Sequence, residues 1–208
     1  MKKFLAGHAT FRREYVAGSK DFLKKLASEH QSPGALYVGC SDSRVVPELL
    51  TTSSPGELFV VRNIANAVPP LENADASVGA ALDYAIEKLH VDNVIICGHY
   101  GCGGIKAVLD GHKKLKSLPS LYEWLDNLAP AILDARLEMV DEEEQWRAAV
   151  ESNVVAQLAN LSTFPNIRER LEAGTLSLHG WVYDLHNGGL MVYDATGERF
   201  VDARAVAS

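Results

Sequence analysis

The sequence has few cysteines, no long apolar run and a deficit of basic residues, and each absence excludes a class of protein. Three cysteines in 208 residues are too few for a disulfide scaffold and fit a reduced compartment. No apolar stretch approaches the roughly 20 residues that span a bilayer, and residues 1–10 lack the apolar segment of a secretory signal. We therefore expect a cytoplasmic protein without a membrane partner. The net charge of −7 argues against nucleic acid as a partner, because a phosphate-binding surface usually carries a basic excess.

Short apolar runs alternate with helical patterns along the chain. The runs are residues 35–38, 58–61 and 94–97. Because they are continuous rather than alternating, they indicate parallel strands that are covered on both faces. A helix is expected between the second and third runs, capped by Asn73 or Asp75. We detect no repeat, low-complexity segment or linker. The predicted fold class is α/β, a central, mostly parallel sheet flanked by helices, in a single domain over residues 1–208.

Both ends of the chain carry additions to this core. Residues 1–30 predict an N-terminal helical arm, with apolar side chains four positions apart among many charges. Such an arm has too little of its own to pack against, so we expect it to lie on a second copy of the chain. Residues 120–161 again show a helical pattern. Strands at residues 176–185 and 190–193 flank a turn at 187–189 and predict a C-terminal antiparallel extension.

Metal-binding residue types follow two of the expected strands. Cys40 comes after the first run, and His99 and Cys102 lie three positions apart in a glycine-rich segment after the third. Loops at the carboxyl ends of parallel strands are where open α/β sheets place their sites. Two thiolates and one imidazole make the three-ligand set of a catalytic zinc site, which keeps a fourth position for water or substrate. Asp42 and Arg44 lie beside the first of these ligands.

The residues alone leave other interpretations of these segments open. A closed structural zinc site would need Asp42 as its fourth ligand. A redox pair of Cys97 and Cys102 is an alternative, although four residues intervene and the spacing is not C-x-x-C. The glycines of residues 98–104 offer a phosphate cradle, although no Walker lysine follows them. For Cys97 itself we favour the role of a small buried hydrophobic residue.

Other polar residues carry weaker signals. His179 lies inside an expected strand and is interpreted as a hydrogen-bonded core histidine. Arg62 closes the second run, where a buried arginine is unfavourable unless it is paired, so we expect it in an ion pair between elements or chains. Four further histidines are expected at the surface, namely His8, His30, His90 and His112.

Four segments in this order resemble the β-class carbonic anhydrases, and most closely their plant and bacterial cytosolic branch. They are residues 40–44 (CSDSR), 57–63 (ELFVVRN), 97–104 (CGHYGCGG) and 179–184 (HGWVYD). The resemblance covers residues 30–200, and the combination is far more specific than any one motif. It implies reversible hydration of carbon dioxide to bicarbonate and a proton. It also implies assembly as a dimer, or as a larger oligomer such as a tetramer, with sites at the interface.

The resemblance assigns roles to the residues of the site. It implies one Zn²⁺ per chain on Cys40, His99 and Cys102. It also implies that Asp42, paired with Arg44, holds the water on the metal in an open site, or itself becomes the fourth ligand in a closed one. The substrate-binding groups implied by position are Gln31, the backbone amide of Gly103 and an apolar wall of Phe59, Ile64 and Tyr84.

A regulatory site of the family is matched only in part. Some bacterial members bind regulatory bicarbonate beside a tryptophan three residues before the first metal ligand, and Tyr37 occupies that position here. Arg62 and Tyr183 match the other two contacts. The resemblance therefore implies an incomplete bicarbonate regulatory site.

The implied mechanism depends on a zinc ion that lowers the pKa of its bound water and supplies hydroxide near neutral pH. Because two thiolates cancel the charge of the ion, this water should be less acidic than water on a three-histidine zinc. The alternative enzyme is a carbonyl sulfide or carbon disulfide hydrolase that uses the same hydroxide. The alternative from a different class is a non-catalytic zinc-binding assembly protein, which would have no need of Asp42 and Arg44.

Overall fold

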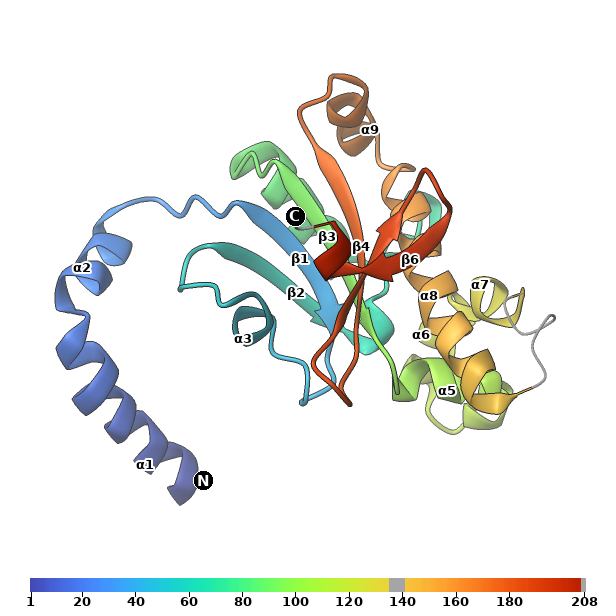
Figure 1. Cartoon of the computed structure of the whole chain (residues 1–208), viewed down its shortest axis with the longest axis horizontal. Helices are drawn as coiled ribbons and strands as arrows, with labels where there is room; N and C mark the ends of the chain where they lie inside the picture. Colours follow the sequence, from blue (N-terminus) through green and yellow to red (C-terminus); the bar gives the residue numbers. More distant parts are fainter. Residues whose placement is uncertain (135–140, 207–208) are drawn as a thin grey trace. The chain divides into compact units, whose positions relative to one another are not determined.

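The computed structural model describes residues 1–134 and 141–206, and the chain divides into two compact units, Met1–Ser32 and Pro33–Ser208. The first unit consists of α1 (Lys2–Phe11), a π-helical turn η1 (Arg12–Val16) and α2 (Lys20–Ser28) (Figure 1). No described residue of these helices is buried. The predicted N-terminal helical segment is confirmed. That the two units form one domain stays a prediction.

The second unit is built on a sheet of six strands within the described residues, in the order β2-β1-β3-β4-β5-β6. The strands are β1 (Ala35–Cys40), β2 (Leu58–Asn63), β3 (Asn93–His99), β4 (Ser177–Tyr183), β5 (Leu190–Asp194) and β6 (Arg199–Asp202). The first four are parallel, and β5 and β6 continue the sheet in antiparallel pairing. The mostly parallel sheet and its antiparallel extension are confirmed, and β6 is an addition that the sequence pattern did not predict.

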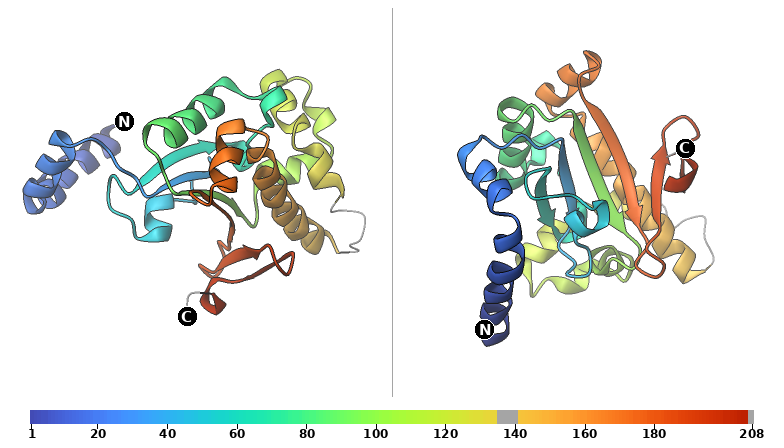
Figure 2. Two further views of the ribbon diagram at one scale, coloured as in Figure 1. Left: turned by 90° about the horizontal axis from the view of Figure 1, so that it is seen from above. Right: turned by 60° about the vertical axis from the view of Figure 1, so that its left-hand side comes forward.

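Helices cover both faces of this sheet. The helical segments described in the second unit are α3 (Pro47–Thr51), η2 (Ile64–Asn66), η3 (Leu71–Asn73), α4 (Ala76–Asp83), η4 (Tyr84–Lys88), α5 (Gly103–Leu109), η5 (His112–Leu115), α6 (Pro119–Asp126), α7 (Ala129–Asp134), α8 (Glu142–Leu161), α9 (Pro165–Glu172) and η7 (Ala203–Ala205). Figure 2 shows α4, α8 and α9 over one face and α3 on the other. Across the described part of the chain, no helix combines the length and apolar character needed to cross a membrane.

Local signals explain where two of these helices begin. The carboxylate of Asp75 accepts hydrogen bonds from backbone amides in the first turn of α4, and Asp141 does the same for α8. The acidic run at residues 141–144 is thus a helix N-terminus, where negative charge is favourable. The helical stretch predicted at residues 120–161 consists of α6, α7 and α8, and its residues 135–140 lie outside the described residues.

The two central strands bring the site together. β1 and β3 are buried along nearly their whole length, as continuous apolar runs require. Their side chains alternate between two clusters. Leu36 and Ile96 pack beneath α4 and α8, whereas Tyr37 and Cys97 face the opposite side with Leu50 of α3. Because β1 and β3 are parallel neighbours, their carboxyl ends and the loops that follow lie at the same edge of the sheet.

Candidate metal centre

The loops after β1 and β3 bring together the three residues predicted to bind zinc. The candidate ligand atoms of Cys40, His99 and Cys102 all lie within 4.8 Å of one another, and all three side chains are buried. The sulfur atoms of Cys40 and Cys102 are 3.9 Å apart. Two thiolates about 2.3 Å from one tetrahedral ion would be roughly 3.8 Å apart, whereas the sulfurs of a disulfide lie about 2.0 Å apart. The spacing therefore fits a shared metal ion.

The imidazole of His99 is oriented as a metal ligand. Its Nδ1 lies 3.1 Å from the carbonyl oxygen of Tyr100, and its Nε2 is buried without a hydrogen-bond partner among the described residues. Donation from Nδ1 to a carbonyl leaves the lone pair of Nε2 available to a metal. Because burying an unpaired polar atom is unfavourable, the orphaned Nε2 fits a metal ion bound at this place.

The thiol groups of Cys40 and Cys102 form a hydrogen-bonded pair in which one sulfur shares its proton with the other. The hydrogen bond from Cys102 lowers the pKa of Cys40 to about 4, and the backbone amide of Ala65 also lowers it. The same hydrogen bond, together with burial, raises the pKa of Cys102. A divalent cation between the sulfurs would relieve this competition, because it stabilises both groups as thiolates. The electrostatics of the pair therefore also fit a bound metal.

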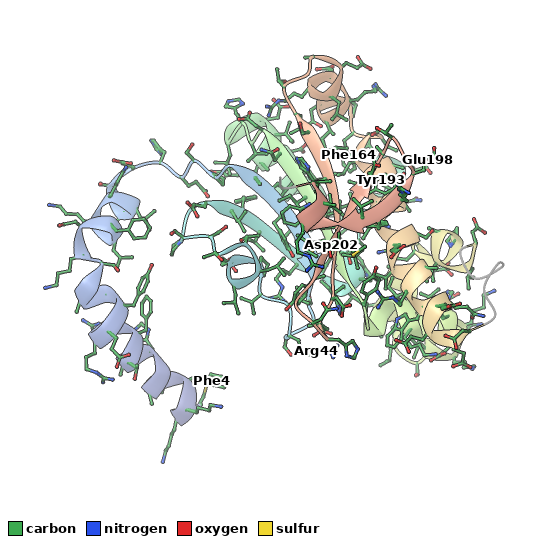
Figure 3. All side chains as sticks on the ribbon, in the orientation of Figure 1. Phe4, Arg44, Phe164, Tyr193, Glu198 and Asp202 are labelled. Carbon is green, nitrogen blue, oxygen red and sulfur yellow. The ribbon has the colours of Figure 1, made fainter. Side chains whose placement is uncertain are left out.

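Arg44 holds Asp42 beside the ligands through a two-point ion pair. Arg44 Nε donates to Asp42 Oδ1 at 2.9 Å, and Nη2 donates to Oδ2 at 2.7 Å. The Arg44 hydrogen bonds hold the pKa of the Asp42 carboxyl far below its usual value. Asp42 Oδ2 lies 3.8 Å from Nε2 of His99, so an ionised oxygen faces the ligand group. Figure 3 shows Arg44 at the loop end of the sheet.

Two of the predicted substrate-binding residues lie next to the ligands. Gly103 is the first residue of α5, directly after Cys102. Ile64 follows β2 and contacts the first turn of α5, where a Cβ added at Gly104 would lie 2.9 Å from Ile64 Cγ2. The indole Nε1 of Trp124 donates to the Ile64 carbonyl at 2.8 Å and fixes this contact. Both residues therefore border the candidate metal centre within one chain.

Two of the other three predicted substrate-binding residues, Phe59 and Tyr84, lie apart from the ligands of the same chain. The rings of Phe59 and Tyr84 stack with their centroids 5.8 Å apart. Phe59 stands four residues before Asn63, the last residue of β2, which places it roughly 13 Å from the loop end of the sheet. Gln31 is exposed and belongs to the first unit. The roles of these three residues stay predictions.

The three residues at the predicted regulatory site form a different arrangement. Tyr37 is fully buried, burial raises the pKa of its hydroxyl, and that hydroxyl has no hydrogen-bond partner within the described chain. Tyr183 packs against the same apolar cluster. Arg62 donates to the carbonyl oxygens of Cys40 and Asp42 at 2.9 and 2.6 Å. It ties the ligand loop to β2 through backbone hydrogen bonds, where the sequence suggested an ion pair.

The structure decides the predictions for three isolated side chains. Cys97 is fully buried, and burial raises the pKa of its thiol to about 12, as expected of a structural cysteine. His179 is half-buried, and its Nε2 lies 2.9 Å from an asparagine oxygen of β3. The surface placement predicted for His112 is wrong. It is 4% exposed, stacks on Tyr122 and hydrogen-bonds Asp126 at 2.9 Å, because the turn between η5 and α6 brings these partners over it.

The sequence analysis did not identify the residues of α8 that donate hydrogen bonds to the backbone of the site. The indole Nε1 of Trp146 donates to the Cys102 carbonyl at 3.0 Å. Asn153 Nδ2 donates to the Ala65 carbonyl at 3.0 Å. Asn153 and Gln157 lie four residues apart on the buried face of α8. Two amides at helical spacing within an apolar face are the signal that would have identified them.

The fold and the site define an α/β protein with a candidate catalytic metal centre at the carboxyl edge of its parallel strands. The family model for carbonic anhydrase matches residues 35–190. A carbonic anhydrase of Pseudomonas aeruginosa is 41% identical, over 97% of this chain and 91% of the relative. Carbonic anhydrase 1 of Escherichia coli O157:H7 is 39% identical, over 99% of this chain and 93% of the relative.

Solved structures agree with these relatives. The β-carbonic anhydrase CcaA matches with a TM-score of 0.92 at 38% identity, covering 97% of this chain and 98% of that one. A tetrameric β-carbonic anhydrase of Sordaria macrospora matches with a TM-score of 0.81 at 30% identity, covering 92% and 95%. The chain therefore belongs to the carbonic anhydrase family, in its β class, and is an enzyme of the lyase type.

Proposed function

We propose that this chain catalyses the reversible hydration of carbon dioxide to bicarbonate and a proton, with one zinc ion bound by Cys40, His99 and Cys102. The observation that carries the proposal is the ionised Asp42 carboxylate, held by Arg44 and facing a buried group of two thiols and an imidazole. This donor set suits zinc, an ion of borderline softness. Zinc bound there would act as a Lewis acid that lets water lose a proton near neutral pH.

Asp42 and Arg44 would orient the attacking water. Because Arg44 keeps Asp42 ionised, the carboxylate accepts hydrogen bonds and does not donate them. Oδ2 of Asp42 would therefore accept a hydrogen bond from the water, so that a lone pair of the water oxygen points toward the substrate carbon. Both carboxylate oxygens also accept bonds from Arg44, which opposes a move of Asp42 into the ligand group.

Carbon dioxide has no net dipole, so an apolar wall with one donor is sufficient to position it. Ile64 and the backbone amide of Gly103 would supply these groups from the same chain. Phe59, which is half-buried, and Tyr84, which is exposed, form an aromatic pair distant from the ligands of their own chain. With Gln31 they would complete the site of a second copy, so the active form would be a dimer or a multiple of dimers.

The test measures zinc content and carbon dioxide hydration on the same samples. Cys40→Ser, His99→Ala and Cys102→Ser should each lose most of the zinc and most of the activity. Cys97→Ser is the matched control and should retain both. Full zinc occupancy in Cys102→Ser would contradict the ligand set. A zinc-loaded parent protein that hydrolyses carbonyl sulfide but does not hydrate carbon dioxide would contradict the proposed reaction.

A further inference from the structure

The loop after β3 carries two of the three candidate ligands on a backbone that glycine makes flexible. His99 ends β3, and Cys102 directly precedes α5. Gly101 lies between them with a φ angle of +77°, in a region that glycine adopts about as readily as the ordinary one. Contacts with other elements must therefore hold the peptide groups of this loop in place.

The backbone carbonyl of Tyr100 orients one of these ligands. Its oxygen lies 3.1 Å from Nδ1 of His99. Because a carbonyl oxygen only accepts hydrogen bonds, Nδ1 carries the proton and the lone pair of Nε2 is left for a metal. The Nε2 atom is buried and has no hydrogen-bond partner among the described residues. The direction of the imidazole therefore depends on where the Tyr100 carbonyl points.

Tyr100 is itself held by two neighbouring elements. Its backbone amide donates to the Tyr183 carbonyl of β4 at 3.0 Å, and its hydroxyl donates to Oε1 of Glu151 on α8. The guanidinium carbon of Arg147, also on α8, lies 3.6 Å from the centre of the Tyr100 ring. Arg147 and Glu151 stand four residues apart and so share one face of the helix. Because Tyr100 is only 4% exposed, water is a poor substitute for these partners.

A further bond to α8 holds the other side of Gly101. The indole Nε1 of Trp146 donates to the Cys102 carbonyl at 3.0 Å. The peptide group between Tyr100 and Gly101 is therefore restricted at both ends by residues of the same helix. Of these contacts, the hydroxyl bond of Tyr100 is the one that a conservative substitution removes without changing the backbone.

We propose that Glu151 is a positioning residue for the metal centre, whose carboxylate holds the Tyr100 hydroxyl so that the Tyr100 carbonyl stays on Nδ1 of His99. The inference rests on the proposed function and deepens it. Glu151 touches neither the metal nor the substrate in this account, and it acts only through Tyr100. Its removal should let the Tyr100 carbonyl move away from Nδ1 and leave the imidazole less well oriented toward the metal.

The first test measures the zinc affinity of the full-length protein by competition with a chromogenic chelator. Glu151→Ala should lower the affinity about tenfold, the lower end of the usual effect of losing an outer-shell partner. Glu151→Gln keeps an oxygen that accepts from the Tyr100 hydroxyl and should stay within about threefold of the parent. Glu144→Ala, at an exposed position of the same helix, is the control and should also stay within about threefold. An unchanged affinity in Glu151→Ala, or an equal loss in Glu151→Gln, would overturn the proposal.

A second comparison asks whether the effect passes through the Tyr100 hydroxyl. Tyr100→Phe removes only that oxygen and should lose as much zinc affinity as Glu151→Ala. Substitutions that remove the same interaction are not additive, so the double variant should lose no more than either single variant. Tyr122→Phe is the matched control, because Tyr122 stacks on His112 outside the site, and it should keep the parent affinity. Additive losses would show that Glu151 acts by another route and would overturn the proposal.

Proton exchange at the histidine rings gives a readout specific to the imidazole of His99. In the zinc-loaded protein with isotope-labelled histidine, NMR detects the Nδ1 proton while a hydrogen bond protects it from exchange with water. Glu151→Ala should accelerate this exchange about tenfold or more. The ring proton of His112 is the internal reference, because His112 is buried and its Nε2 lies 2.9 Å from Asp126 Oδ1. Equal acceleration at both histidines would indicate a general loss of stability and would overturn the proposal.

The conservative variant and the parent protein decide the matter if Glu151→Ala does not fold. A protected Nδ1 proton on His99 in the zinc-loaded parent, with faster exchange in Tyr100→Phe, supports the proposal. Absence of protection in the parent, or unchanged exchange in Tyr100→Phe, overturns it. If the parent protein binds no zinc, the proposed function itself fails, and this outcome is distinct from a normal zinc affinity in Glu151→Ala.

Discussion

At the scale of single residues, the proposed reaction depends on the Asp42–Arg44 ion pair. The side chain of Asp42 is 17% exposed, whereas that of Arg44 is 58% exposed. Solvent screens the exposed partner, so the pair contributes modest stability despite its two-point geometry. A metal cation would attract the same carboxylate. With a metal bound, the position of Asp42 would be a balance between the arginine and the metal, and a single substitution should change it.

Arg44→Ala should keep its zinc and lose carbon dioxide hydration by about 100-fold or more, the range expected when a proton-handling group is lost. Without Arg44, Asp42 is free to become the fourth ligand. Arg204 is the matched control, because it makes the same two-point pair with Asp202 at 2.9 and 2.6 Å outside the site. Arg204→Ala should keep both zinc and activity. Activity assays, zinc analysis and a crystal structure of Arg44→Ala check this, and an active Arg44→Ala with Asp42 away from the metal would refute it.

The thiol pair predicts how zinc binding depends on pH. The hydrogen bond between the two sulfurs lowers the pKa of Cys40 and raises that of Cys102, so the pair holds about one proton at neutral pH. Zinc requires both as thiolates, so binding at pH 7 should release about one proton, and zinc affinity should rise about tenfold per pH unit in this region. Calorimetry in two buffers of different ionisation enthalpy measures the release. Release of two protons, or of none, would contradict the prediction that the metal-free thiol pair holds one proton.

At the scale of elements, α8 organises the centre. Its side chains reach the loop after β3 through Trp146 and the segment after β2 through Asn153. It also packs directly on two strands, where Gly98 of β3 and Gly180 of β4 leave room for Val154. Figure 2 shows α8 lying along this face of the sheet. The helix can approach so closely because those two strand positions carry no side chain.

Gly180→Ala should destabilise the protein by about 1–3 kcal/mol, the usual effect of overpacking a core. The added Cβ would lie 2.9 Å from Leu158 Cδ1 and 3.1 Å from Val154 Cγ1. Gly79→Ala is the control, because Gly79 lies within α4 and an added Cβ meets nothing within 4 Å. It should stabilise the protein by about 0.4–1 kcal/mol. Urea unfolding measures both, and a Gly180→Ala variant as stable as the parent would show that α8 is not held at this spacing.

At the scale of the whole molecule, apolar surface indicates assembly. The first unit exposes large apolar side chains, of which Figure 3 labels Phe4. They are Phe4, Leu5, Phe11, Tyr15, Phe22 and Leu26. A helical segment of this kind is stable only when another surface covers it. A second copy would cover it and would also bring Phe59 and Tyr84 to the site.

Sedimentation velocity should show a dimer or a larger oligomer at assay concentration. Phe22→Glu should weaken the assembly and reduce activity with it, because it places a charge on the apolar side of α2. Lys24→Glu changes an exposed charged residue of the same helix and should leave both unchanged. A fully active monomer would contradict a site shared between two chains.

Much of the fold and the ligand set followed from local signals in the sequence. Continuous apolar runs identified β1, β2 and β3. Asp75 was one of two residues predicted to cap a helix, because short polar side chains satisfy free amides where a helix begins. Cys40, His99 and Cys102 were found because their side-chain chemistry is specific and the loops that follow parallel strands share one edge of a sheet. Each of these inferences needs only a few neighbouring residues or the general geometry of a sheet.

Only the tertiary structure decided the features whose partners lie far along the chain. His112 is buried because residues 10 and 14 positions later fold over it, and Arg62 donates to the carbonyl of Cys40 on a neighbouring strand. Ala65 has a left-handed conformation, which alanine does not prefer, and its carbonyl accepts a hydrogen bond from Asn153, 88 residues away. The sequence by itself determined which residues can bind a metal, and the packing of α8 against the strand ends determined how they are held. The chemistry of a side chain is a property of a single residue. An unfavourable backbone conformation, in contrast, persists only where contacts with distant residues hold it in place.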